Sequence, residues 1–433
     1  MRFPDLDSVE NHLNSLINYE HAFPLGGPRD RPKLDPTLQA VERLSLSLSL
    51  PGCVHIAGTK GKGSVVCFLE GLLTPDAPVL SFTSPHLTSF TERLRYGGKP
   101  LAPDLWQRGF EEIVPAFAEE PAIRLTYFET TWVMFLWAAR ALNTAVNLVE
   151  AGLGGKWDAT NVLTNTMAVL TSVDYDHTDV LGDTLTEIAA DKAGIIKEKS
   201  QVIIGRQPDE ALRVFRSVAD SMTAHACIFG DEFSWTEESA DRFQYQDAQG
   251  TIGGLSLNAP GLHQRDNAAV ALRVARLLRP ELSESEIRTR LAACTVPARQ
   301  QLLPGAPEIL IDVAHNPVSF RALAETIRQR FSERRILMVF GMMRNKDATA
   351  SLSALKGLVR DVVPVELNSP RSAKQADLRE IAESLGMNVV CPPSLEDAFR
   401  MLHERDKHNL GLVAGSFYLA GDYLLWRRRA GIA

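Results

Sequence analysis

Short apolar runs alternate with longer stretches of helical periodicity along most of the chain. The runs are rich in Val, Ile and Leu, and the segments between them are long enough for crossover helices, which is the pattern of parallel sheets. In the first two-thirds of the chain the expected strands are Cys53–Ala57, Val79–Thr83, Ala145–Val149, Ala168–Val173 and Gln201–Ile204. They predict one large α/β domain.

The pattern changes between Ile228 and Asn258, where short polar and aromatic segments contain several glycines. We expect strands there, at the edge of the first domain. An Ala-rich helix is predicted over Gln264–Leu278, before Pro280. The segment Leu44–Leu50 alternates Leu and Ser as a strand would, yet it continues a helical pattern, so both structures stay open.

The segment TVPARQQLLPGAP, residues 295–307, contains three prolines and a glycine and is typical of a domain boundary. We expect one domain over residues 1–296 and a smaller one over residues 297–433. In the second domain the predicted strands are Ile309–Val313, Ile336–Phe340, Val362–Leu367, Val389–Cys391 and Leu410–Ala414. Sites in such folds lie at the carboxyl ends of the strands.

Composition excludes several classes of function. A length of 433 residues suits two or three domains, and a net charge of -7 argues against a nucleic-acid binder. The chain lacks an apolar run long enough for a membrane span, and its first residues lack the pattern of a signal peptide. The five cysteines include no C-x-x-C pair, which indicates a reduced chain without a zinc site. We therefore expect a cytoplasmic protein.

The segment HIAGTKGKGSVVCFLEGLL, residues 55–73, carries the sharpest chemical signal. A short apolar run leads into three glycines around Lys62 and then into a predicted amphipathic helix. Glycines let backbone N–H groups face an anion, the helix start adds its positive end, and the lysine adds a point charge. The order differs from the standard phosphate-loop pattern because Lys62 precedes the last glycine. A glycine turn that binds nothing is the alternative, but the flanking elements and Ser64 favour phosphate binding.

Three other strand ends carry groups that suit a magnesium nucleotide. They are SFTSPHL (81–87), VEAGLGGKWDATN (149–161) and SVDYDHTDVLG (172–182). Magnesium uses one or two carboxylates together with phosphate oxygens and waters, and Glu150 is the obvious carboxylate. Ser84 and His177 would each be an ordinary turn or loop residue if taken alone. Their joint placement at strand ends indicates a metal site.

With these motifs in place, the sequence resembles the dihydrofolate synthase/folylpolyglutamate synthase family, a branch of the Mur ligases. The resemblance covers nearly the whole chain, through GTKGKGS, TSPHL with ERLRYGG, LTYFE, GLGGKWDATNV, DHTDVLGDTLTEIAADKAGIIK, DVAHNP, FGMMRNKD and GSFYLAGDYL. It implies a P-loop-type parallel-sheet ATPase domain followed by a smaller Rossmann-like α/β domain. It also implies an ATP-dependent ligase that adds L-glutamate to dihydropteroate or to folate polyglutamates.

The resemblance assigns roles to individual residues. The ATP phosphates would be held by Gly58, Thr59, Gly61, Lys62, Gly63 and Ser64. Further ATP contacts would come from Asn267, Arg299, Asp312 and His315, so that ATP lies between the domains. Magnesium would be bound by Ser84, Glu150 and His177, with Lys192, as a carbamate, helping to hold a second metal. The pterin portion would contact Thr126, Tyr127, Phe128, Trp157, Asp158 and Ala159.

ATP would convert the substrate carboxylate to an acyl phosphate, which the glutamate amine then attacks. Charge on the transferred phosphoryl group needs neutralisation, for which Lys62 and magnesium are suited. The amine must lose a proton, and His315 is a candidate for accepting it or for holding phosphate. The catalytic residues predicted are therefore Lys62, Lys192 and His315. The family also implies a monovalent cation such as K+, small-molecule partners only and a monomer.

The chain departs from the family at Lys60, where Asn is usual, and at Lys156-Trp157, where Arg-Leu is usual. It also has Pro297-Ala298-Arg299-Gln300 in place of Pro-Gly-Arg-Phe. These changes concern the substrate more than ATP. Trp157 and Lys156 leave open a Mur-type ligase for another amino acid and acid. A nucleotide-binding regulatory module without catalysis is the second alternative, against which the intact set of Lys62, Glu150, His177, Lys192 and Asp312 argues. The pattern also leaves open which glutamate the enzyme adds.

Overall fold

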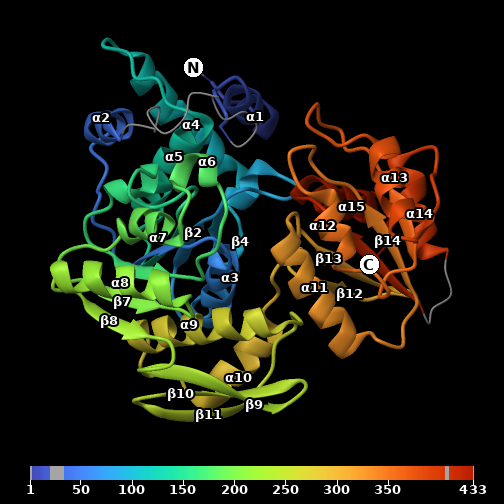
Figure 1. Cartoon of the computed structure of the whole chain (residues 1–433). Coiled ribbons are helices and arrows are strands. Elements are labelled where there is room, and N and C mark those ends of the chain that lie inside the picture. Colours follow the sequence, from blue (N-terminus) through green and yellow to red (C-terminus); the bar gives the residue numbers. More distant parts are fainter. Residues whose placement is uncertain (1, 20–33, 405–408, 433) are drawn as a thin grey trace. The chain divides into compact units, whose positions relative to one another are not determined.

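The computed structural model describes residues 2–19, 34–404 and 409–432 (Figure 1). The chain divides into two compact units, which are described separately. The first unit comprises Met1–Ser256 and Arg265–Cys294, and the second comprises Leu257–Gln264 and Thr295–Ala433. The main change of unit thus follows Cys294, two residues before the boundary expected from the proline-rich segment.

The first unit is built on an eight-stranded sheet in the order β4-β3-β2-β5-β1-β6-β7-β8. Six neighbouring strands run parallel, and β3 and β4 are antiparallel at one edge. The strands are β1 (Cys53–Ala57), β2 (Val79–Phe82), β3 (Leu94–Tyr96), β4 (Lys99–Pro100), β5 (Val146–Glu150), β6 (Met167–Leu170), β7 (Gln201–Ile204) and β8 (His225–Ile228). Every residue of β1, β2 and β5 is buried, as expected of parallel strands covered on both faces.

Helices cover both faces of this sheet. One face carries a core formed with α1, α2, α4 and α5, in which Leu80 and Phe82 of β2 take part. On the other face Ser81 of β2 contacts Glu70 of α3. The helices are α1 (Leu6–Asn14), α2 (Asp35–Arg43), α3 (Lys62–Leu73), α4 (Pro103–Ala118), α5 (Tyr127–Leu142), α6 (Thr178–Leu181), α7 (Leu185–Ala193), α8 (Asp209–Ser221), α9 (Leu262–Leu278) and α10 (Glu284–Ala293), with short 3-10 turns η1 (Phe90–Arg93) and η2 (Ala159–Val162).

The structure decides two points that the sequence left open for this unit and contradicts one expectation. The strands expected after Ile228 belong to the first unit, in which they form a separate antiparallel sheet of β9 (Phe233–Ser239), β10 (Arg242–Asp247) and β11 (Gly250–Leu255), against which α10 packs (Figure 1). Residues 44–50 form neither helix nor strand, because α2 ends at Arg43 and Ser45 has a φ of 51°. Helix α3 is not amphipathic, since it is buried along nearly its whole length.

The second unit has a six-stranded sheet in the order β12-β13-β17-β14-β15-β16, in which only β12 is antiparallel. Its strands are β12 (Gln301–Leu303), β13 (Glu308–Asp312), β14 (Ile336–Phe340), β15 (Asp361–Pro364), β16 (Asn388–Val389) and β17 (Leu410–Ala414). Its helices are α11 (Pro317–Arg330), α12 (Ala348–Ser353), α13 (Gln375–Ser384), α14 (Leu395–His403) and α15 (Phe417–Arg429). The expected fold class, a parallel-sheet domain followed by a smaller α/β domain, is confirmed. In the part of the chain that the structure describes, no helix is long and apolar enough to cross a membrane.

His55, in the middle of β1, makes the stability of the first unit depend on pH. Its ring is fully buried and its Nε2 lies 2.8 Å from Thr160 Oγ1. Burial, and then the positive charge of Lys197, lowers the pKa of His55 to about 3. The ring is therefore neutral in the folded protein below the ordinary histidine pKa of about 6.5, at which the unfolded chain takes up a proton. Stability is complete above that pH and falls as the pH drops toward 3.

We expect His55→Gln to remove this contribution to the pH dependence of stability, because glutamine keeps an N–H donor but does not titrate. Between pH 7 and pH 5 the loss in the free energy of unfolding should be smaller than in the wild type by about 2 kcal/mol. Urea unfolding followed by tryptophan fluorescence measures it, because five of the six tryptophans lie in the first unit. The same pH dependence in both proteins would contradict a neutral buried His55.

Candidate active site

The glycine-rich loop between β1 and α3, for which phosphate binding is predicted, is called the phosphate loop below. It is held to the segment that follows β6 by hydrogen bonds. The N–H groups of Thr59 and Lys60 both donate to the carbonyl oxygen of Ser172, at 2.9 and 3.2 Å. The Thr59 hydroxyl donates to the Asp174 carbonyl and accepts from the Asp174 N–H. Lys60 Nζ lies 2.8 Å from Asp174 Oδ2. The departure at Lys60 thus adds an ion pair that holds the loop, and its ammonium is directed to Asp174.

Gly61 and Asn267 meet at the start of α3. Gly61 has a φ of 91°, and a Cβ atom there would lie 2.3 Å from the side-chain oxygen of Asn267. Only glycine satisfies both the left-handed backbone and this close approach. The structure therefore brings Asn267, which lies on α9, against the phosphate loop, and its contact with ATP stays a prediction.

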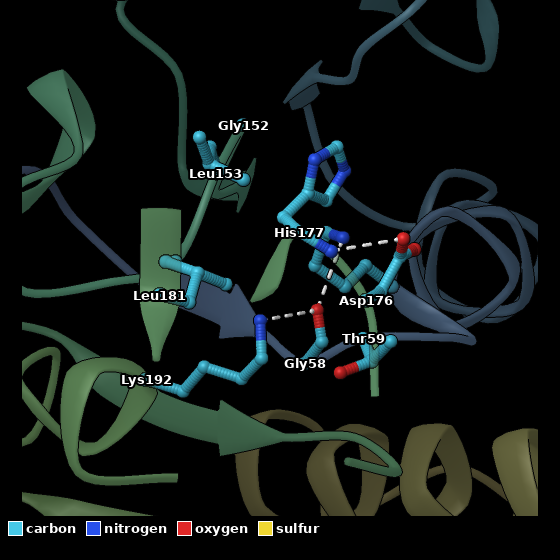
Figure 2. A pocket seen from close by; sticks show the side chains of 10 residues that line it. Gly58, Thr59, Gly152, Leu153, Asp176, His177, Leu181 and Lys192 are labelled. Carbon is cyan, nitrogen blue, oxygen red and sulfur yellow. Dashed lines mark hydrogen bonds between the residues drawn. The ribbon is translucent and has the colours of Figure 1, made fainter. Parts of the chain in front are cut away.

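A small pocket of about 50 Å3 lies at the carboxyl edge of the sheet (Figure 2). It is lined by residues of the phosphate loop, of the segment after β5, of the turn before α6 and of α7. These residues are Gly58, Thr59, Lys62, Gly152, Leu153, Gly154, Asp176, His177, Leu181 and Lys192. Of the residues proposed from sequence, Gly58, Thr59, Lys62, His177 and Lys192 meet here, whereas Asp176 and the Gly152–Gly154 wall were missed. Asp176 stands beside His177 in SVDYDHTDVLG, so its position at a strand end was the available signal.

Two lysines share one acceptor in this pocket. Lys62 Nζ donates to the Gly58 carbonyl oxygen at 3.1 Å, and Lys192 Nζ donates to the same oxygen at 3.2 Å (Figure 2). Lys192 is only 3% exposed. Its burial, followed by the positive charge of Lys62, lowers the pKa of Lys192 to about 7. A large share of Lys192 is therefore a neutral amine near pH 7, unlike an ordinary lysine.

Glu150 ends β5 and connects this pocket to the turn after β2. Its Oε1 lies 3.9 Å from Lys62 Nζ, and its Oε2 accepts the Ser84 N–H at 3.3 Å. The carboxylate also borders Gly63, whose Cβ, if present, would lie 3.5 Å from Oε2. Ser64 follows in the first turn of α3, where it is buried. Ser84 and Glu150 are thus neighbours, and both approach the phosphate loop.

A metal at this place would need a mixed set of ligands. Within residues 2–19, 34–404 and 409–432 no group of three or more His, Cys, Asp or Glu side chains is arranged to hold a metal ion. One buried carboxylate beside a serine, next to a loop suited to phosphate, fits magnesium, which keeps several waters and takes phosphate oxygens. The donors present therefore fit a metal that arrives with a nucleotide.

The turn that carries Ser84 is held by Glu92. The Glu92 carboxylate accepts the N–H groups of Leu87 and Thr88, at 2.8 and 3.1 Å. The next residue, Arg93, donates to His86 Nδ1 at 3.0 Å and lies 4.8 Å from the centre of the Tyr127 ring. ERLRYGG was recognised as part of the resemblance, but these supporting contacts were not predicted from it.

The residues proposed for the pterin portion fall into two groups. Thr126 caps α5 and Tyr127 is buried, while Phe128 lies against Gly152 of the pocket wall. After β5, Trp157 is 40% exposed, with the Lys156 ammonium 5.3 Å from its ring centre. Within this set the aromatic residues Phe128 and Trp157 are not buried, and Thr126 is also partly exposed.

Asp158 and Ala159 begin the turn η2 and support the pocket wall. Asp158 accepts the N–H groups of Leu153 and Thr160, at 2.9 and 3.0 Å. Burial raises the pKa of Asp158, although these hydrogen bonds oppose the shift. Ala159 is buried. These contacts give Asp158 a structural task in holding the Gly152–Gly154 wall.

The second unit collects its predicted residues at the carboxyl end of β13. Asp312 accepts the N–H groups of Gln300 and Ala314, at 2.9 and 2.6 Å. Burial raises the pKa of Asp312 to about 6, against the opposing charge of Arg299. His315 Nδ1 lies 3.0 Å from the Val313 carbonyl oxygen, to which it can only donate. In the neutral ring Nε2 then carries the lone pair.

Phe417, at the start of α15, was missed as a site residue. The Arg299 guanidinium lies 5.0 Å from its ring centre, and the His315 ring centre lies 6.1 Å away. The loop that presents Arg299 is strained on both sides, since Ala298 and Gln300 have φ values of 51° and 52°. Glycine is the residue that adopts this conformation at no cost, so the alanine costs about 1 kcal/mol.

Comparison with known proteins identifies the family of the chain. Residues 298–417 match the Mur ligase, glutamate ligase domain family. The chain is 34% identical over 392 residues to the dihydrofolate synthase/folylpolyglutamate synthase of Escherichia coli, covering 90% of each chain. The structure of E. coli FolC in complex with DHPP and ADP has a TM-score of 0.85 at 30% identity and covers 99% of this chain and 98% of that one. The Yersinia pestis bifunctional folylpolyglutamate synthase/dihydrofolate synthase complexed with AMPPNP and Mn ion has a TM-score of 0.83 at 30% identity, with 97% of each chain covered. The chain belongs to the dihydrofolate synthase/folylpolyglutamate synthase family of Mur ligases.

Proposed function

We propose that this enzyme joins L-glutamate to a pterin-linked carboxylate, using ATP to form an acyl phosphate. The observation that carries the proposal is the arrangement around Lys62. Its ammonium lies between the Gly58 carbonyl and the Glu150 carboxylate, at the start of a buried helix. A phosphate loop whose lysine also borders a metal-binding carboxylate suits phosphoryl transfer, which depends on position and charge.

The nucleotide phosphates would be bound by Gly58, Thr59, Gly61, Lys62, Gly63 and Ser64, with Asn267 beside the loop. We propose Mg2+ as the metal, with Ser84, Glu150 and His177 as its protein ligands and Lys192 at a second position. When bound, the metal would neutralise charge on the transferred phosphoryl group. A monovalent cation such as K+ completes the proposed cofactors. The nucleotide and Mn ion of the Yersinia pestis complex support an adenine nucleotide with a divalent metal.

Residues of the second unit would serve the later steps. Arg299 and Asp312 would contact ATP, and His315 would contact phosphate or accept the proton of the glutamate amine. The amine titrates near pH 8 and must be neutral to attack. Because Nδ1 of His315 donates its proton to the Val313 carbonyl oxygen, Nε2 is the nitrogen suited to accept the proton of the amine. The reaction forms an amide and releases phosphate.

We place the pterin portion against Phe128 and Trp157, near Thr126, Tyr127, Asp158 and Ala159. The DHPP in the E. coli complex supports a ligand of this kind. The five cysteines are all free thiols, which supports a reducing compartment such as the cytoplasm, and we expect a monomer. The exposed Trp157 and its neighbour Lys156 depart from the residues usual in the family. They therefore support a second candidate function, a Mur-type ligase for a different acid.

A coupled assay tests the proposal. ATP hydrolysis should require dihydropteroate or tetrahydrofolate together with L-glutamate, and mass spectrometry should find products heavier by one or more glutamyl residues. Hydrolysis supported by another acid and amino acid would favour the second candidate. Nucleotide binding without any ligation would indicate a module that has lost catalysis.

Glu150→Gln tests the metal site, because it keeps the shape of the side chain and removes its charge. We expect ATP to bind about tenfold or more weakly in the presence of Mg2+ and nearly unchanged in its absence. Calorimetric titrations under both conditions measure the difference. An equal change in affinity with and without Mg2+ would mean that Glu150 is not a metal ligand.

A further inference from the structure

Behind the turn that carries Ser84 lies a buried ion pair for which the proposed reaction gives no role. It joins Arg95 of β3 to Glu70 of α3, with Arg95 Nε 3.0 and 3.1 Å from the two carboxylate oxygens and Nη2 3.0 Å from Oε2. The Glu70 side chain is 9% exposed and that of Arg95 is 17% exposed. Ser81 of β2 also donates to Glu70. A buried charged pair is not by itself evidence of stability, so it invites a functional explanation.

The same guanidinium continues to the metal-binding turn. Arg95 Nη1 donates to the Thr83 hydroxyl at 3.0 Å and to the Glu92 carbonyl at 3.2 Å. Thr83 immediately precedes Ser84, whose N–H donates to Glu150. A chain of contacts therefore runs from the helix that follows the phosphate loop, through Arg95 and Thr83, to the proposed metal ligands.

The topology explains why these side chains meet. Ser81 pairs with Arg95 in the antiparallel register of β2 and β3, so both side chains point to the same face of the sheet. Thr83 is two residues after Ser81 and continues that direction, and α3 covers this face with Glu70. The helix that starts at Lys62 and the turn that holds Ser84 are thus joined by one guanidinium.

We propose that Arg95, oriented by Glu70, is a positioning residue that sets the Ser84 turn relative to the phosphate loop by its hydrogen bond to Thr83. The inference rests on the proposed metal site and adds residues that act on it without touching the nucleotide. A guanidinium suits this task because its planar fork binds a carboxylate on one edge and leaves Nη1 for a second acceptor. Loss of the bond to Thr83 should loosen the turn and weaken the binding of Mg2+ with the nucleotide.

Thr83→Val tests the bond, because it keeps the shape of the side chain and removes the hydroxyl. We expect the Mg2+ concentration for half-maximal ATP binding to rise about tenfold, the scale of one lost hydrogen bond to a charged group. ATP affinity without Mg2+ should change by less than about twofold, and Thr83→Ser should restore the wild-type response. Titration calorimetry of ATP over a range of Mg2+ concentrations measures this without relying on turnover.

Thr144→Val is the matched control for stability. Its hydroxyl is also buried and bonded to a side chain, at 2.8 Å from Asn147 Oδ1, but it lies at the amino end of β5. It should lower the melting temperature without changing the response to Mg2+. An unchanged response in Thr83→Val, or the same shift in both variants, would overturn the proposal.

The double variant Glu70→Met with Arg95→Met decides the matter if Thr83→Val does not fold. Replacing both members of a buried pair by apolar residues is often neutral for stability, and here it leaves the net charge unchanged. We expect the same rise in the Mg2+ requirement, and a wild-type requirement would overturn the positioning role. If ATP binding by the wild type does not depend on Mg2+, the proposed metal site and this inference are both overturned. If the wild type depends on Mg2+ and the variants show the same dependence, only this inference is overturned.

Discussion

Lys62→Ala should abolish ligation while leaving the fold nearly intact. The ammonium lies 3.9 Å from Glu150 and is the point charge of the phosphate loop, so its loss removes stabilisation of charge on the transferred phosphoryl group. Removal of one such group costs about 3 kcal/mol or more of transition-state stabilisation, which is at least about a hundredfold in turnover. The ligation rate of the purified variant measures the loss, and its melting temperature reports the fold.

Lys60→Asn is the matched control for Lys62→Ala. It removes a lysine two residues away in the same loop, but that ammonium is paired with Asp174 and not with the pocket. The ion pair is still partly exposed to solvent and is worth about 1 kcal/mol or less, and Asn is the usual residue of the family. We expect turnover to fall only slightly. Near-normal turnover of Lys62→Ala would remove the phosphate-loop assignment.

The parallel strands were predictable because both of their faces are buried. Strands Cys53–Ala57, Gln201–Ile204 and Ile336–Phe340 have the predicted ends, since their apolar runs stop where the chain reaches the edge of the sheet. Strands were expected within Phe233–Leu255, but the sequence did not show that they form a sheet of their own, because a pattern of short polar and aromatic segments indicates strands without indicating which strands pair. The sequence around Ser45 was ambiguous because a single left-handed residue ends the helix there.

Some residues of the site are close together in the sequence, whereas others are brought together only by the fold. The loop Gly58–Ser64 could be predicted since glycine spacing, lysine and helix start are contiguous in the sequence. Phe417 and the Arg95–Glu70 pair could not, because their partners Arg299 and Thr83 are brought near only by strand pairing and helix packing. Lys192 was assigned by resemblance alone, since a lysine on a helix normally faces solvent.

The burial of Lys192 gives that assignment a physical reason. The helix α7 is drawn close to the pocket wall, where Asp191 accepts the N–H of Gly155 at 2.9 Å and a Cβ at Gly155 would collide with the Lys192 backbone. Glycine at this position allows the approach that buries the lysine. The neighbouring pattern DKAGIIK therefore depends on GLGG, which is distant in the sequence.

We predict that Lys192 is carbamylated in the active enzyme. The neutral amine attacks carbon dioxide, a C–N bond forms, and one proton leaves to solvent, which yields an anionic carbamate. An ordinary lysine is almost entirely protonated at neutral pH, but burial and the charge of Lys62 lower the pKa of Lys192 to about 7. At fixed dissolved carbon dioxide, the reactive fraction should rise as the pH rises through 7. The product replaces a buried cation beside Lys62 by an anion, and it offers two hard oxygens to a metal.

Lys192→Ala should then lose ligation by about a hundredfold or more, and a short carboxylic acid added to the assay should restore part of it by supplying oxygens in the vacated space. Lys197→Met is the matched control, because Lys197 follows on the same segment and its pKa is also lowered by burial, yet its ammonium is held by the carbonyl and side-chain oxygens of Asn161. It should respond neither to carbon dioxide nor to the acid. Enzyme stripped of carbon dioxide should regain activity on addition of bicarbonate, with a mass increase of one carbon dioxide that maps to Lys192. An unmodified amine at Lys192 in an active magnesium complex, together with full activity of Lys192→Ala, would refute the carbamate, because neither its charge nor its oxygens would then serve the reaction.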